Sequence, residues 1–342
     1  MTGNTLGWVI VAFVLYLLMM IAIGAFYAKG NNNSEDYFLG GRKLNGFVAA
    51  LSAQASDMSG WLLMGLPGAI YLTGVGGDGW IAIGLFIGTT LNWLFIATKL
   101  RRYTIRANNS VTLPTYFENR FHDEKKVLMT VSSITIVVFF LVYCASALSA
   151  GGQLFESVFG IDYHVALTIG ALVVLVYTFL GGFTAVCVTD FIQGMLMLVG
   201  ILAVPLFAYH FLTTGGTTLS AGLEASGADS ANFLNLMKNG DGSNNIISVI
   251  SGLGWGLGYF GMPHILVRFM AVRDEKEMTK SKATAISWVA LSLGFAVFIG
   301  ILGRAYLPEL VNGNNEKVFI EMIKKVFTVE MRAPFIAGLF LC

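Results

Sequence analysis

The sequence predicts an all-α polytopic membrane protein. Of its 342 residues, 56% are apolar and only 12% are charged, about half the charged fraction of an ordinary soluble domain. The mean hydropathy is +0.72. Long segments, such as 127–155 and 191–223, contain no Asp, Glu, Lys or Arg, and each exceeds the roughly 20 residues that one helical crossing needs. Composition therefore argues against a water-soluble globular protein.

Charge balance and cysteine placement exclude two further classes. The 21 basic and 20 acidic residues nearly cancel, so no excess of positive charge indicates nucleic acid as a partner. Cys144, Cys187 and Cys342 lie in apolar sequence without metal-ligand spacing, and we interpret them as reduced and buried. The apolar run that ends at Ala28 is too long for a signal-peptide core, so we expect the first helix to be retained.

Eight apolar segments are long enough to cross a membrane. We predict spans at residues 6–28, 46–72, 79–98, 127–158, 164–182, 190–212, 246–270 and 283–306. A ninth begins near Ala333, and its apolar run to Cys342 has about half the length of a crossing. We therefore expect the chain to end inside a helix, as a C-terminally truncated fragment.

The segments between the spans predict the topology. Most of the 21 Lys and Arg residues lie on one side if the N-terminus is outside, so we predict a multi-pass protein of the cell membrane in that orientation. A short loop is expected at 181–190, and a longer one rich in Gly, Ser, Thr and Asn at 213–245. At 315–329 apolar residues recur at helical spacing among charged ones, which predicts an amphipathic surface helix. Its apolar positions are Val318, Phe319, Met322, Ile323, Val326 and Phe327.

The second span is a poor uninterrupted helix. Polar residues gather near its middle, where Asp57 lies between Ser56 and Ser59, and Pro67 follows. An ionised carboxylate at membrane depth costs at least about 2.5 kcal/mol. We therefore expect Asp57 to face a protein-lined cavity that provides a cation or hydrogen-bond donors. The alternative is that Asp57 caps one half of the helix and holds no ligand.

The seventh span is interrupted in the same way. Five glycines and Pro263 fall within residues 251–263, a composition that breaks a helix and leaves backbone groups free. The Gly-x-Gly-x-x-Gly pattern at 256–261 lies inside an apolar span and not after a strand, so we do not interpret it as a dinucleotide site. Trp255 and Tyr259 share a helical face. They form either a wall for a small cation-bearing ligand or a structural aromatic pair.

Two interrupted spans, five positions apart in the order of helices, are typical of an inverted-repeat secondary transporter. We predict a single transmembrane transporter domain over 1–342. Within it, 6–28 is an extra helix, 46–212 the first five-helix repeat, and 246–342 the start of a second, truncated repeat.

Several motifs in these segments resemble the sodium/solute symporter family, over nearly the whole chain. Gly-Gly-Phe at 181–183 is similar to the general family signature. Ser-Asp-Met-Ser-Gly-Trp at 56–61 and Trp-Gly-Leu-Gly-Tyr-Phe-Gly at 255–261 are similar to its proline branch. Further resemblances lie at 39–42, 113–117, 143–146, 189–190 and 262–270.

This resemblance implies both fold and activity. The fold would be the inverted-repeat (LeuT-like) transporter fold with one extra N-terminal helix and, here, an incomplete second repeat. The activity would be import of L-proline coupled to sodium by alternating access, within membrane lipid. Sodium would be the coupling ion, and no other cofactor is expected.

The resemblance also implies site residues. The carbonyls of Ala55 and Met58 would contribute to a sodium site, for which Asp57 is needed. Arg42 and Asp190 would act in coupling or gating, although loop anchoring and helix capping explain them equally well. Proline would contact Ser59, Tyr143, Trp255, Tyr259 and Pro263.

Two alternatives remain at this stage: a sodium symporter for another small solute, and the transporter-like membrane part of a sensor protein. An enzyme is not expected and no catalytic residue is assigned, because no nucleophile and base are paired in the sequence. The four histidines are scattered, at His122, His164, His210 and His264. Only His264 lies near the expected site, where we interpret it as structural.

Overall fold

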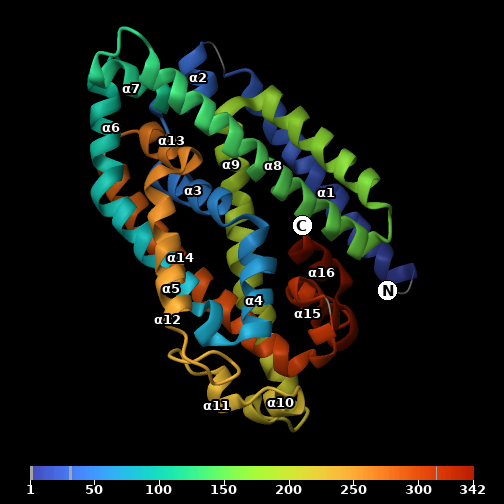
Figure 1. Cartoon of the computed structure of the whole chain (residues 1–342). Coiled ribbons are helices and arrows are strands. Elements are labelled where there is room, and N and C mark those ends of the chain that lie inside the picture. The colour runs from blue at the N-terminus through green and yellow to red at the C-terminus, as the bar shows by residue number, and fades with distance from the viewer. Residues whose placement is uncertain (1–2, 31–32, 313) are drawn as a thin grey trace.

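The structure is a computed structural model that describes residues 3–30, 33–312 and 314–342. Over these residues the chain is an elongated bundle of helices (Figure 1). One end carries the short helices α2 (Ser34–Leu39) and α7 (Leu113–Phe121), and is called the α7 end below. The other, the α10 end, carries α10 (Leu219–Ala225) and α11 (Ser230–Phe233).

The second predicted span is broken, as expected. It comprises α3 (Gly46–Gly60), the π-helical turn η2 (Trp61–Gly65) and α4 (Leu66–Thr73). At Ser59 the backbone adopts φ 46° and ψ −161°, a region that a residue with a side chain rarely occupies and that persists only where surrounding packing holds it. The interruption therefore lies two residues after Asp57.

The seventh predicted span is broken as well. Helix α12 (Ile246–Trp255) passes into the 3₁₀ segment η4 (Gly256–Gly261), and α13 (Pro263–Ala271) starts after Met262. The two halves are bent by 46°. Proline suits the first position of the second half because that position needs no N–H donor.

The third span is longer than predicted. It runs without a gap through α5 (Val75–Leu91), η3 (Asn92–Ile96) and α6 (Ala97–Arg106). The basic residues near its end did not stop the helix, since long Lys and Arg side chains reach the polar interface from a helix terminus. Gly84 faces the backbone of Gly252, so a small residue lets α5 and α12 approach closely.

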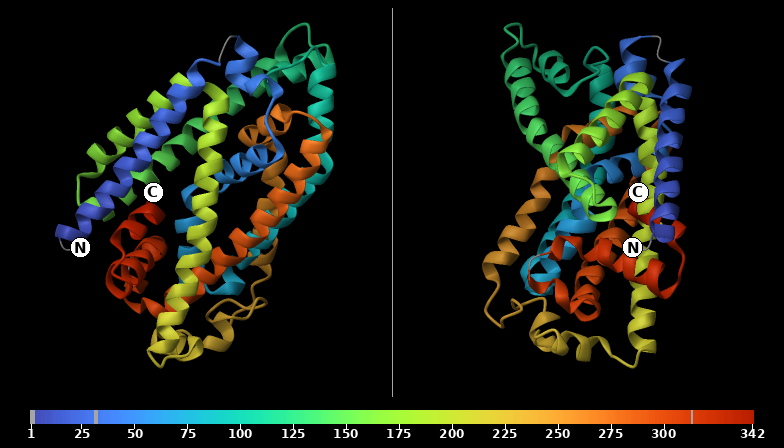
Figure 2. Two further views of the ribbon diagram at one scale, coloured as in Figure 1. Left: turned by 180° about the vertical axis from the view of Figure 1, so that it is seen from behind. Right: turned by 90° about the vertical axis from the view of Figure 1, so that its right-hand side faces the viewer.

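Helices α8 (Val127–Phe159) and α9 (Tyr163–Thr214) cover one side of the bundle together with α1 (Gly3–Ala28) (Figure 2). We expected a loop at 181–190, and this was wrong: the helix resumes directly after Gly182. Gly182 has φ 61° and ψ −162°, so one glycine reverses the chain. From this turn the two arms diverge: 163–181 runs alongside α1 and α8, and 183–214 descends through the bundle to the α10 end (Figure 1).

The amphipathic prediction for 315–329 is confirmed. Residues Asn315–Lys317 (η6), Val318–Ile323 (α15) and Lys324–Glu330 (η7) are helical, and all six apolar positions named above are buried. They pack against α14 (Glu275–Tyr306), α4, α9 and α16 (Pro334–Leu341). Helix α16 also lies along α1.

In the described part of the chain, five helices are long and apolar enough to cross a membrane, or six if the bent pair of α12–η4 and α13 is one span. The multi-pass prediction is thus supported by composition and length. One expectation about cysteine was wrong in part: Cys187 is buried, whereas Cys144 is exposed on the bundle surface and Cys342 is half-buried. An apolar surface suits Cys144 there, because lipid rather than water faces such a helix.

Candidate functional site

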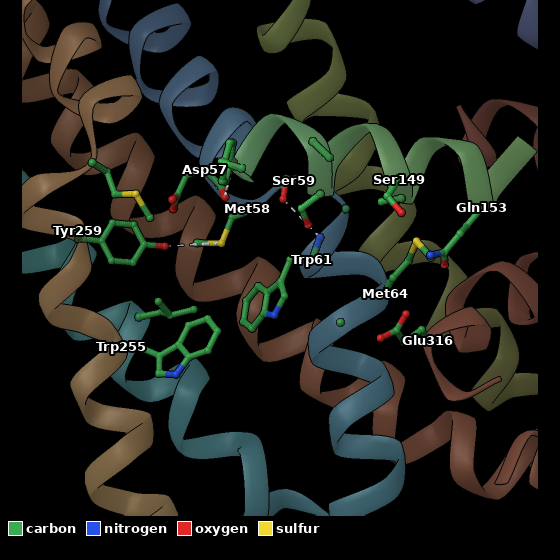
Figure 3. A pocket seen from close by; sticks show the side chains of 18 residues that line it. Asp57, Met58, Ser59, Trp61, Met64, Ser149, Gln153, Trp255, Tyr259 and Glu316 are labelled. Atoms are coloured by element: carbon green, nitrogen blue, oxygen red, sulfur yellow. Dashed lines mark hydrogen bonds between the residues drawn. The ribbon is translucent and has the colours of Figure 1, made fainter. Parts of the chain in front are cut away.

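A cavity of about 500 Å³ opens beside the two helix breaks (Figure 3). It extends from the break in α3 to η6, on the α10 side of that break. Six of the residues proposed from sequence line it together: Asp57, Met58, Ser59, Tyr143, Trp255 and Tyr259. These residues come from α3, α8, α12 and η4, so tertiary structure gathers four segments around one space.

Asp57 is the buried acid of this cavity. Only 4% of its side chain is exposed, and its Oδ2 atom has no hydrogen-bond partner among the described residues. Its Oδ1 atom lies 3.8 Å from Nε2 of His264, and both ring nitrogens of that histidine are buried and similarly unpaired within the described residues. A carboxylate held in this way can accept a cation, since a buried acceptor without a partner is otherwise costly.

Two tyrosines link the break to neighbouring helices. The hydroxyl of Tyr143 donates to the Ser56 carbonyl at 2.7 Å. The hydroxyl of Tyr259 points at the sulfur of Met58, 3.9 Å away (Figure 3). The carbonyl of Tyr259 accepts a 2.8 Å hydrogen bond from the side chain of Asn92. Backbone groups freed by the interruptions are thus partly satisfied by side chains.

Two indoles form another side of the cavity. Trp255 ends α12, and its ring stacks on that of Trp61 with centroids 5.6 Å apart and planes 25° from parallel. Tyr259, four residues further on, is 3% exposed, whereas Trp255 is 48% exposed. The two residues expected to share a face do line one cavity, Tyr259 as a buried residue and Trp255 toward its open part.

The remaining candidates lie elsewhere. Ala55 lines a second cavity of about 400 Å³, between α3, α8, α9 and α16. Pro263 lines a third, of about 520 Å³, near α7. The carbonyl of Met58 accepts the backbone N–H of Trp61, which leaves one lone pair available. The structure therefore brings neither Ala55 nor Pro263 into the first cavity.

Asp190 belongs to a buried polar network on the α7 side of the break. Its Oδ2 atom accepts hydrogen bonds from Ser52 at 2.7 Å, from Ser56 at 2.9 Å and from Arg268 at 2.8 Å. Arg268 also donates to the His264 carbonyl. The network joins α3, α9 and α13 on the α7 side of the cavity.

Arg42 occupies a second polar network nearer the α7 end. Its guanidinium donates to Asn109 at 2.9 Å, to the Met270 carbonyl at 2.8 Å and to the Ser110 carbonyl at 2.9 Å. Burial lowers the pKa of Arg42, and the nearby carboxylate of Glu35 opposes that effect. These bonds tie the segment that precedes α3 to the loop after α6 and to α13.

Comparison with known proteins identifies the family. The model of the sodium:solute symporter family matches residues 37–342, which include every residue that lines the cavity and both Arg42 and Asp190. The chain belongs to the sodium:solute symporter family.

Members of this family with curated functions resemble the chain closely. Sodium/proline symporters of Salmonella typhimurium and Escherichia coli are 44% and 43% identical over 338 residues, and that of Staphylococcus aureus is 41% identical over 334 residues. Each match covers 97% of this chain. The chain spans 62 to 64% of the length of these relatives.

A solved structure confirms the fold of this symporter-family chain. A sodium-coupled sialic acid symporter, in a substrate-bound outward-open state, superposes with a TM-score of 0.78 at 20% identity, over 98% of this chain and 70% of that one. The predicted all-α, inverted-repeat (LeuT-like) transporter fold is confirmed.

Sequence reasoning missed several residues of this family member's site. Arg268 was not proposed as a site residue, although an arginine within an apolar span indicates a buried acidic partner. His264 was interpreted as structural, and it lies beside Asp57. Trp61, Gln153 and Glu316 line the cavity. Gln153 and Glu316 come from segments far from either break, so the sequence held no signal for them.

Proposed function

We propose that this protein imports L-proline together with sodium by alternating access. One observation carries the proposal: a buried carboxylate with an unpaired oxygen meets aromatic and hydroxyl side chains in one cavity, at the breaks of two helices. The sodium/proline symporters that are 41 to 44% identical to the chain support the choice of solute.

The cavity suits the chemistry of proline. The solute is a zwitterion with an apolar ring, so the site must satisfy a carboxylate and a secondary ammonium group and also enclose the ring. Backbone N–H groups at a helix break attract carboxylates. We assign Ser59 and Tyr143 to polar contacts and Trp255 and Tyr259 to the ring, because all four line the cavity. Pro263 acts indirectly, by starting α13 beyond the break.

Sodium would bind at the break in α3. It is a hard cation that prefers oxygen ligands, and Asp57 offers an unpaired carboxylate oxygen. The carbonyls of Ala55 and Met58 would add to this site. Ala55 faces the second cavity, so the ion would lie between the two cavities. Sodium is the coupling ion of the mechanism, which needs no further cofactor.

The two polar networks would close the α7 side of the cavity. The cavity extends from the break in α3 to η6, whereas Asp190 with Arg268, and Arg42 nearer the α7 end, bind the helices together on its α7 side. With the N-terminus outside, the α10 end is extracellular, and the conformation faces outward from the cell membrane. In this assignment 46–212 is the first repeat, 246–342 is the start of the second, 6–28 is the extra helix, and Arg42 and Asp190 act in coupling or gating.

The driving force is sufficient with one sodium ion. Moving one charge inward is worth about 2.3 kcal/mol per 100 mV, and a tenfold sodium gradient adds about 1.4 kcal/mol. Together they sustain a proline gradient on the order of several hundred-fold.

Uptake of radiolabelled proline into proteoliposomes tests the proposal. The protein expressed from its complete gene is reconstituted beside the chain of 342 residues, with an inward sodium gradient and with potassium in its place. We expect sodium-dependent uptake by the gene product. Folded protein that takes up no proline under a sodium gradient would refute the proposal.

A second candidate is sodium symport of another small solute. The size of the cavity, about 500 Å³, and the polar groups of Gln153 and Glu316 at its far side favour it. Unlabelled amino acids, sugars and carboxylates competing for sodium-dependent binding distinguish the two: strong competition by a solute other than proline would favour this second function.

A further inference from the structure

Trp61 has a position in the cavity that none of the assignments above explains. It is the first residue after the break at 59–60, and its N–H donates to the Met58 carbonyl. The backbone of the break thus directly sets where the side chain starts. Its indole extends into the cavity between the break and Trp255 (Figure 3).

The neighbouring Gly65 provides the space for this indole. A Cβ atom on Gly65 would lie 2.6 Å from Cδ1 and 3.0 Å from Nε1 of Trp61, closer than atoms of side chains approach. The backbone of Gly65 is helical, with φ −65°, so its conformation does not require glycine. Glycine inside a helix is less stable than alanine by about 0.5–1 kcal/mol. The room it leaves for the indole is therefore the physical reason for glycine at this position.

The indole then meets its counterpart from the other interrupted span. Trp61 belongs to the first and Trp255 to the second, and the rings stack at 25°. This pair forms a continuous apolar, π-rich surface that faces the same cavity as Ser59, Tyr143 and Tyr259. Such a surface packs a small ring by area and attracts an ammonium group through the ring face.

We propose that Trp61, seated on Gly65 and stacked on Trp255, is a specificity-determining residue that sets the size of the solute ring. The inference rests on the proposed function and deepens it. The solute class is that of cyclic α-amino acids with a secondary ammonium group, in which ring size is discriminated by the distance between this wall and Tyr259.

Binding of a ring-size series tests this inference. Equilibrium binding of azetidine-2-carboxylate, proline and pipecolate, which have four-, five- and six-membered rings, is measured with saturating sodium for the wild type, Trp61→Ala, Trp61→Phe and Gly65→Ala. We expect Trp61→Ala to weaken proline binding about tenfold and to shift the preference toward pipecolate. The sodium concentration for half-maximal binding should remain within about twofold, a split that general damage to the fold would not produce.

Gly65→Ala fills the space that Gly65 leaves for the Trp61 indole, without changing the indole itself. Because it would displace Trp61, we expect an effect in the same direction as Trp61→Ala. The double variant of Trp61→Ala and Gly65→Ala should bind proline no more weakly than Trp61→Ala alone, because without the indole the added methyl group displaces nothing. Gly294→Ala, a helical glycine with no atom within 4 Å of the added Cβ, is the matched control and should bind as the wild type does.

The outcomes separate this inference from the proposed function. If the wild type binds proline with sodium but all three variants keep its ring preference and affinity, the role of Trp61 is overturned and the proposed function stands. If Gly65→Ala weakens proline binding equally in the wild type and in Trp61→Ala, Gly65 does not act by leaving space for the indole. A wild type that binds none of the three rings overturns both. Trp61→Phe keeps an aromatic ring and provides a folded variant if Trp61→Ala is unstable.

Discussion

The guanidinium of Arg268 donates a hydrogen bond of 2.8 Å to the carboxylate of Asp190. Arginine comes from the second half of one interrupted span, α13, and aspartate from α9. Side-chain exposure is 6% for Arg268 and 12% for Asp190. The pair also forms hydrogen bonds with Ser52 and Ser56 of α3. One ion pair therefore connects three helices on the α7 side of the cavity.

Breaking this pair should destabilise the protein strongly. Arg268→Met leaves a buried carboxylate and Asp190→Leu leaves a buried guanidinium, and each loss should lower the free energy of unfolding by about 3–5 kcal/mol. The double variant should be more stable than either single one, because it leaves neither charge unpaired. Thermal unfolding in detergent measures this. Arg102→Met breaks an exposed pair with Glu275 and should change the midpoint little. Additive losses in the double variant would contradict the coupling.

Asp57→Asn should act mainly on sodium. The amide keeps the size of the side chain and removes its charge, so the sodium concentration for half-maximal proline binding should rise at least about tenfold. Proline affinity at saturating sodium should change much less. Binding of labelled proline over a sodium titration gives both values. Equal changes in the two would remove Asp57 from the cation site.

The contact between α5 and the second broken helix should tolerate no side chain at Gly88. A methyl group there would overlap the backbone of Gly256, and the helices would have to separate. We expect Gly88→Ala to lower stability by about 1–3 kcal/mol. Gly170→Ala, where the added Cβ meets nothing within 4 Å, should be neutral or slightly stabilising. Thermal unfolding of the two variants measures this difference. Equal midpoints would show that the close approach of α5 to the backbone of Gly256 does not require glycine at position 88.

Asp274 should make the start of α14 sensitive to acid. It accepts the backbone N–H of Glu277 at 2.9 Å and a bond from Arg273 at 3.0 Å, and these hold its pKa below the usual 3.8. A carboxyl group whose pKa is lower in the folded state adds stability above the unfolded pKa and loses it as pH falls through the folded one.

Asp274→Ala should therefore lower the unfolding midpoint near pH 6, and the difference from the wild type should shrink as pH falls toward 3. Unfolding curves over that pH range measure it. Asp274→Asn keeps a capping side chain and should lose less at pH 6. A difference that is constant with pH would show that the charge has no part in the cap.

Much of the fold could be predicted because membrane helices are encoded locally. Polar residues around Asp57, and the glycines before Pro263, interrupt apolar runs, and both breaks occur where they were expected. Helix ends were less predictable. The turn in α9 lies at Gly182, where a span was predicted to end, but the helix resumes directly after this glycine and the loop expected at 181–190 does not form.

The site could be predicted only where its residues lie in the interrupted spans. Tyr143 is the exception, and it was found through the resemblance to the family. Trp61 lies in an interrupted span but was not proposed, whereas Gln153 and Glu316 join the cavity because distant segments meet there. Pro263 marks the second break in the sequence, yet its ring faces the third cavity, since the bend after η4 turns α13 away.

The amino-acid sequence by itself determined that this is a multi-pass helical protein, that two of its spans are broken, and which acid lies at membrane depth. Hydropathy and helix-breaking residues act over a few neighbouring positions, so they can be interpreted without a structure. Only the tertiary structure decided that Asp190 pairs with Arg268, that Trp61 stacks on Trp255, and that Ala55 and Pro263 face other cavities. Those relationships depend on the angles at which helices pack, and packing is set by contacts between residues far apart in the chain.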